Sequence, residues 1–169
     1  MGTGLSRSSS LYRLVPKIFR VNERSKTAIL IVEDDGLIAL GMMESLAREG
    51  YRVLEPVSTG EDAIARCGDH PRPDLILMDV HLAGSIDGIE AARRIREQYP
   101  IPVIILTACT DGMTGRRMKE LSPDGYLVKP VAFHELLAAI SLVTGSQARR
   151  GCPEVPERPP GGFRLRTER

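Results

Sequence analysis

The middle of the chain alternates between short apolar runs and segments in which apolar residues recur at helical spacing. The apolar runs hold four or five residues, many of them β-branched, and they end at charged or turn-forming residues. Such runs are typical of strands that are buried on both faces. We therefore expect strands at 28–32, at 51–54, within 73–81, at 103–106 and at 125–128.

Helices are predicted after each of these strands. After the first strand, Ile38, Met42 and Leu46 recur at helical spacing, and Gly50 provides a C-terminal stop signal. The segment 111–121 predicts a weak helix, because each of its two glycines costs about 1 kcal/mol relative to Ala. The other predicted helices lie at 58–68, 89–98 and 133–143.

The order of these elements predicts the fold class. Five strands that alternate with five helices indicate an α/β fold, a doubly wound five-stranded parallel sheet with helices on both faces and right-handed crossovers. Ligands of such sheets bind beyond the carboxyl ends of the strands. Polar residues at those ends are therefore the first candidates for a functional site.

The two ends of the chain differ from the middle in composition and charge. Residues 1–26 and 146–169, the second rich in Pro, Gly and Arg, are expected to be disordered extensions of one domain at 27–145. They carry six Lys or Arg against one Glu and six Arg against three Glu, which leaves eleven basic and eighteen acidic residues in the middle. This acidic domain argues against nucleic acid as its partner.

Cysteine usage and hydropathy favour a cytoplasmic protein. Cys67, Cys109 and Cys152 are odd in number and widely spaced, which indicates free thiols in a reducing compartment. No stretch approaches the roughly 18 consecutive apolar residues that span a bilayer, so we expect no membrane segment.

Polar residues that follow the predicted strands can meet at one edge of the sheet. Glu33 and Asp34 follow the first strand, whereas Asp79, Thr107 and Lys129 follow the third, fourth and fifth. Three neighbouring carboxylates repel one another, so the cluster needs a hard cation such as Mg²⁺ beside Lys129. A carboxylate in these surroundings can attack a phosphoryl group and hold it as an aspartyl phosphate, to which Thr107 would donate a hydrogen bond.

These residues resemble the motifs of a response-regulator receiver domain. The resemblance covers 27–145, and its motifs are Ile-Leu-Ile-Val-Glu-Asp-Asp at 29–35, Leu-Met-Asp at 77–79, Leu-Thr-Ala at 106–108 and Tyr-Leu-Val-Lys-Pro at 126–130. It implies the flavodoxin-like fold, Mg²⁺ as cofactor, and a phosphoryl group received from a histidine kinase or a histidine phosphotransfer protein.

The resemblance also implies roles for single residues. The catalytic set would be Asp79 as phospho-acceptor, Lys129 and Thr107. The metal set would be Glu33, Asp34, Asp79 and the backbone carbonyl of His81. The switch residues would be Thr107 and Tyr126.

Two features depart from the commonest pattern of that family. Glu33 stands where Asp is commoner, which changes the reach of the carboxylate rather than its role. The loop 82–88 is longer than the usual Met-Pro loop and resembles a subgroup of stand-alone receivers, and no known output domain resembles the tail. We therefore expect a single-domain receiver that signals by protein contact. Its fourth helix, fifth strand and fifth helix would bind a target protein or a second copy.

Other interpretations depend on particular positions. A lone Asp at the end of a strand is usually a cap or turn residue. The functional interpretation of Asp79 therefore depends on the polar residues that follow the other strands. A Mg²⁺-dependent phosphatase with an Asp nucleophile usually has a second Asp two residues later, where this chain has His81. A phosphate-independent pseudo-receiver is disfavoured by the intact Asp79, Lys129 and Thr107.

The first predicted helix carries a second apolar stripe beside the one that faces the core. Leu37, Leu40 and Met43 form this stripe. Three apolar residues in line on a surface indicate a docking face. The resemblance implies that a kinase helix would dock there.

Overall fold

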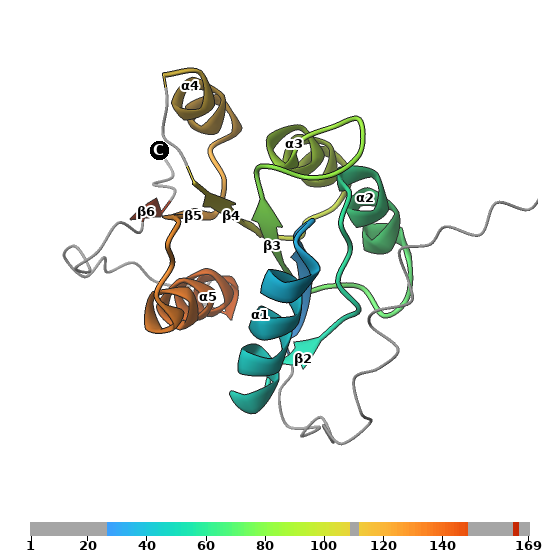
Figure 1. Cartoon of the computed structure of the whole chain (residues 1–169), viewed down its shortest axis with the longest axis vertical. Helices are drawn as coiled ribbons and strands as arrows, with labels where there is room; N and C mark the ends of the chain where they lie inside the picture. Colours follow the sequence, from blue (N-terminus) through green and yellow to red (C-terminus); the bar gives the residue numbers. More distant parts are fainter. Residues whose placement is uncertain (1–26, 109–111, 149–163, 166–169) are drawn as a thin grey trace, which may run out of the picture.

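The computed structural model describes residues 27–108, 112–148 and 164–165, which form one sheet between two layers of helices (Figure 1). The order of strands is β2-β1-β3-β4-β5-β6. Strands β1 to β5 pair in parallel, and β6 pairs antiparallel with β5. The strands are β1 (Ala28–Val32), β2 (Arg52–Val53), β3 (Leu75–Asp79), β4 (Val103–Thr107), β5 (Gly125–Val128) and β6 (Arg164–Leu165).

Helices cover both faces of the sheet. In Figure 1, α2, α3 and α4 lie on one side of the strands and α1 and α5 lie on the other. The helices are α1 (Gly36–Arg48), α2 (Gly60–Gly68), α3 (Gly88–Gln98), α4 (Gly112–Leu121) and α5 (Phe133–Ala148). Among the described residues, none of these helices has the length and apolar character needed to cross a membrane.

The strand alternation separates the core into two clusters. In β1, Leu30 and Val32 pack toward α2 and α3, whereas Ile29 and Ile31 pack toward α1 and α5. Every residue of β1, β3 and β4 is buried, as expected for strands covered on both faces. The continuous apolar runs of the sequence therefore correspond to the central strands.

The predicted doubly wound α/β fold is confirmed, and the helix termini agree with the local signals. Asp35 caps α1 by accepting hydrogen bonds from the N–H groups of Leu37 and Ile38. Gly50 follows this helix with φ +89°, a left-handed conformation that glycine adopts without strain. The expected stop of the first helix at Gly50 is therefore confirmed.

The structure differs from the sequence-based boundaries at the C-terminal side. Helix α5 continues to Ala148, three residues beyond Gly145, where we placed the end of the domain. Gly145 is exposed, and a Cβ there would meet no atom within 4 Å. A glycine at such a position costs the helix only about 1 kcal/mol, which neighbouring turns can offset.

The strand β6 was not predicted. Its two residues fall in the segment 146–169, for which we expected no structure, and they pair with Gly125 and Tyr126 of β5. Without this segment β5 would be an edge strand whose outer N–H and C=O groups lack a ladder partner. The rest of the expected tail, 149–163 and 166–169, and the expected extension at 1–26 lie outside the described residues, as do Cys109 and Cys152.

The burial of Cys67 leads to a first prediction. Its thiol is fully buried and donates to the carbonyl oxygen of Ala63, and burial raises its pKa to about 11. At pH 8 we expect iodoacetamide to modify Cys67 in the native protein more than about 100-fold more slowly than in guanidinium chloride. Peptide mass mapping over time measures both rates. Equal rates in the two solvents would contradict the buried position.

A second prediction concerns the C-terminal segment. Among the described residues of this segment, Arg164 and Leu165 pair with β5, and the free energy of their hydrogen bonds is offset by the entropy lost when a chain segment is fixed against the sheet. Deletion of 149–169 should therefore lower the free energy of unfolding by no more than about 1 kcal/mol in urea titrations. The control Leu136→Ala removes a buried core side chain and should cost about 2–5 kcal/mol. A deletion as costly as this control would contradict the prediction.

Candidate functional site

Strand alternation brings three charged residues to one face at the carboxyl edge of the sheet. Glu33 continues the face of Ile29 and Ile31, and Asp79 continues the same face of β3. Lys129 follows Leu127, which also packs on this face. Because side chains repeat every two residues in a strand, the ends of β1, β3 and β5 direct these groups to one side.

The ammonium group of Lys129 lies between two buried carboxylates. Its Nζ donates to Oε2 of Glu33 at 2.8 Å and to Oδ2 of Asp79 at 2.9 Å. Glu33 and Asp79 are only 2% and 5% exposed. Their burial requires such a partner, because an unpaired buried carboxylate is strongly unfavourable.

The electrostatics of this group favour a further cation. Burial raises the pKa of Glu33, and the charge of Asp79 adds to this effect, so that together they outweigh Lys129. Burial alone would lower the pKa of Lys129, but the two carboxylates raise it overall. One ammonium group therefore serves two carboxylates, and the site remains negatively charged.

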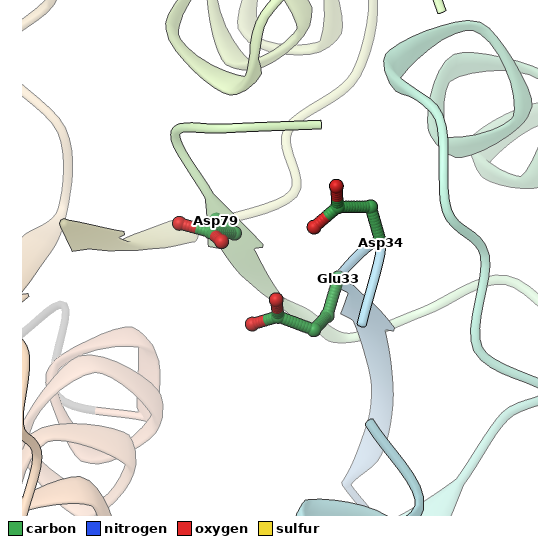
Figure 2. Close-up of side chains that lie close together, drawn as sticks. All are labelled: Glu33, Asp34 and Asp79. Carbon is green, nitrogen blue, oxygen red and sulfur yellow. The ribbon is translucent and has the colours of Figure 1, made fainter. Parts of the chain in front are cut away.

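Asp34 completes a group of three carboxylates that could hold a metal ion. One oxygen of each of Glu33, Asp34 and Asp79 lies within 4.8 Å of the others (Figure 2). Oδ1 of Asp79 is buried and finds no hydrogen-bond donor among the described residues. Oxygen ligands around an unpartnered carboxylate oxygen are the donor set that Mg²⁺ prefers. The residues present therefore fit a divalent cation.

Thr107 and Tyr126 lie on the other face of the sheet. Thr107 is buried at the end of β4, next to Leu106, which is in register with Asp79. The ring of Tyr126 is partly buried against the cluster under α2, α3 and α4. The side chain of His81 is exposed, and the role predicted for this residue involves its backbone carbonyl. Those roles remain predictions from the resemblance.

The loop between β3 and α3 is anchored on both sides. Oε1 of Glu61 accepts a hydrogen bond from the N–H of Ser85 at 3.0 Å and another from its hydroxyl group. Gly88 donates its N–H to the carbonyl oxygen of Val80 at 2.9 Å. The role of Glu61 was missed, because no local pattern relates it to a loop 24 residues away.

The first helix does not present the expected docking stripe. Leu37 is 83% exposed, but Leu40 and Met43 are only partly exposed, and Met43 packs against the core. Ile38, which we assigned to the core side, is 46% exposed instead. The exposed apolar surface is therefore Leu37 and Ile38, in the first turn of α1 and close in sequence to Asp34.

The comparisons with known proteins agree with this geometry. Residues 29–141 match the model of the response regulator receiver domain. The transcriptional regulatory protein PdtaR of Mycobacterium tuberculosis is 35% identical over 114 residues, which are 68% of this chain and 55% of PdtaR. AfsQ1 of Streptomyces coelicolor, also a transcriptional regulatory protein, is 42% identical over 116 residues, 69% of this chain and 50% of AfsQ1.

Solved structures show the same fold. The receiver domain of a modulated diguanylate cyclase from Desulfovibrio desulfuricans G20 superposes with a TM-score of 0.66 at 38% identity, covering 72% of this chain and 96% of that one. A CheY-like receiver domain protein from Methanospirillum hungatei JF-1 gives a TM-score of 0.67 at 27% identity, covering 74% and 98%.

The fold and the acidic edge define a signalling receiver domain. The chain belongs to the response regulator receiver family, whose members act in two-component systems. It spans about half the length of the curated relatives that it matches. The resemblance predicted from the motifs is therefore confirmed.

Gly88 provides a third prediction. A Cβ there would lie 1.8 Å from the carbonyl oxygen of Asp79, which leaves no room for a side chain. Gly88→Ala should therefore lower the free energy of unfolding by about 3 kcal/mol or more. The control Gly41→Ala lies in α1 with no atom within 4 Å of the added Cβ and should raise stability by about 0.5–1 kcal/mol. Urea titrations measure both, and equal effects would contradict the close approach.

Proposed function

We propose that Asp79 accepts a phosphoryl group from a phosphohistidine of a histidine kinase or a histidine phosphotransfer protein. The observation that carries this proposal is the state of the Asp79 carboxylate. One oxygen is bound by Lys129, and the other is buried without a donor among the described residues. A carboxylate that holds no proton needs no general base to act as a nucleophile.

The proposed transfer step involves Asp79, Lys129 and Thr107. A carboxylate oxygen of Asp79 attacks phosphorus, the P–N bond of the phosphohistidine breaks, and the imidazole nitrogen keeps the electron pair. Lys129 stabilises negative charge on the phosphoryl oxygens, and Thr107 donates a hydrogen bond to them. The domain thus catalyses its own phosphorylation and is otherwise a signalling protein.

A Mg²⁺ ion completes this proposal. Glu33, Asp34, Asp79 and the backbone carbonyl of His81 would hold it. When bound, the ion neutralises charge that accumulates on the phosphoryl oxygens. The carboxylates of Glu33 and Asp34 keep that ion beside Asp79, which is why an acidic edge can accept an anionic group.

Two surfaces are suited to the protein contacts of a cytoplasmic phosphorelay. The exposed pair Leu37 and Ile38 offers a small apolar patch beside the acidic edge, which suits an apolar segment of the phosphodonor. On the output side, movement of Thr107 would leave space for Tyr126. Met113 and Val128 are exposed apolar residues of α4 and β5 on this side, where a target protein or a second copy would bind.

A fourth prediction tests the acceptor. Incubation of the wild-type protein with acetyl phosphate and Mg²⁺ should add the mass of one phosphoryl group, and hydroxylamine should remove it, because an acyl phosphate is cleaved by this nucleophile. Asp79→Asn should fold normally and gain no such group, whereas Asp34→Asn should mainly raise the Mg²⁺ concentration required. Intact mass spectrometry measures all three.

The matched control is Asp62→Asn, an exposed carboxylate in the first turn of α2. It should be phosphorylated like the wild type. If Asp79→Asn still gained one hydroxylamine-sensitive group, or if chelation of Mg²⁺ had no effect on the wild type, the proposed acceptor site would be wrong.

A further inference from the structure

Helix α4 makes two charged contacts with α3. Arg117 of α4 donates from Nη1 and Nη2 to the two carboxylate oxygens of Asp87, at 2.5 and 2.9 Å. Arg96 of α3 donates to the carbonyl oxygens of Leu121 and Ser122, at 2.7 and 2.5 Å. One contact fixes the side of α4, and the other fixes its C-terminal end.

These contacts carry much of the attachment of α4, because its apolar packing is small. Met118 is the one buried residue of this helix, and Met113 is 75% exposed. A groove with mainly charged walls separates the two helices. The glycines at 112 and 115 make α4 intrinsically weak. Loss of the bidentate Asp87–Arg117 ion pair should therefore destabilise the whole of α4.

Asp87 is joined to the proposed phospho-acceptor through Gly88. Asp87 is the N-cap of α3, and its Oδ1 accepts a hydrogen bond from the N–H of Glu90 at 2.9 Å. Its neighbour Gly88 lies directly against the carbonyl oxygen of Asp79, without space for a Cβ. A displacement of the main chain after Asp79 must therefore move the start of α3, because no flexible side chain lies between them.

The charge of Asp87 is maintained by Arg117. Partial burial raises the pKa of Asp87, but hydrogen bonds from Arg117 and from the N–H of Glu90 lower it overall below its ordinary value. About 36% of the Asp87 side chain and 42% of the Arg117 side chain remain exposed. The pair can thus exchange its contacts for water without leaving a buried charge, which makes it reversible.

We propose that Asp87 and Arg117 are a positioning pair that couples the phosphorylation of Asp79 to the position of α4. The proposal rests on the proposed function of Asp79. A phosphoryl group adds bulk at the start of the β3–α3 loop, and the acyl phosphate carries about two negative charges in place of the single charge of a carboxylate. The loop then moves and Asp87 shifts relative to Arg117, which weakens the ion pair that attaches α4 to α3. This route follows β3 and α3 and is separate from Thr107 and Tyr126, which lie on β4 and β5.

Thermodynamic linkage gives the sign of the effect. If phosphorylation weakens the pair, then loss of the pair must favour the phosphorylated state by the same factor. Couplings of this kind typically change an equilibrium by about twofold to thirtyfold.

The variants separate the pair from helix capping. Arg117→Ala removes the guanidinium group. Asp87→Ser keeps a good N-cap for α3, but its side chain is too short and uncharged to hold Arg117. The double variant tests whether both act through one contact. Arg116→Ala is the matched control, since it removes an exposed arginine from the next position of the same helix.

Hydrogen exchange of the unphosphorylated proteins tests the contact itself. Amides of α4 should exchange about threefold or more faster in Arg117→Ala and in Asp87→Ser, and the double variant should add little to either. Arg116→Ala should match the wild type. If α4 exchanged at the wild-type rate in both single variants, the pair would not position this helix and the proposal would fail.

A mimic of phosphorylation tests the coupling. Equilibrium binding of beryllium fluoride, a non-covalent mimic of the phosphoryl group, in the presence of Mg²⁺ should tighten about threefold to tenfold in either single variant and no further in the double variant. Faster exchange in α4 with an unchanged affinity would overturn the coupling. A wild-type protein that takes up no phosphoryl group from acetyl phosphate would instead disprove the proposed function, and the coupling with it. The hydrogen-exchange data would still show whether the Asp87–Arg117 contact positions α4.

Discussion

The ammonium group of Lys129 holds together the part of the structure on which the site depends. Glu33 and Asp79 are buried at the ends of two neighbouring strands, and without Lys129 two negative charges would face each other with little water. This constraint also fixes register. A shift of one residue in β1, β3 or β5 would send its charged residue to the opposite face of the sheet and break the contact. The fold and the acidic edge therefore specify each other.

Most of the fold was predictable because parallel strands covered on both faces leave continuous apolar runs. The elements that such runs do not specify were missed or misplaced. Strand β6 depends on a segment of two residues that pairs with an exposed edge, and Gly145 does not end α5 because nothing opposes its place in the helix. The exposure of Ile38 has a similar cause: α1 is apolar on several sides, and its rotation is set by packing against the sheet.

The charged residues of the site were predictable, because each follows an apolar run directly and the ends of parallel strands meet at one edge. The polar contacts around them were not. Glu61 reaches Ser85 across 24 positions, and Arg117 reaches Asp87 across 30. Both contacts depend on how two helices or a helix and a loop lie against each other, which local periodicity does not encode. The sequence pattern thus predicts the positions of residues at the ends of strands better than the contacts of residues on the surfaces of helices.

The weak attachment of α4 is consistent with a signalling role for this domain. A covalent phosphoryl group can shift a conformational equilibrium only by its differential stabilisation of the two states. A helix held by a large apolar interface would resist a shift of that size. Helix α4 instead combines one buried residue, two glycines and two charged contacts at partly exposed positions. Its alternative positions can therefore differ by a small free energy, while the two core clusters keep the rest of the sheet unchanged.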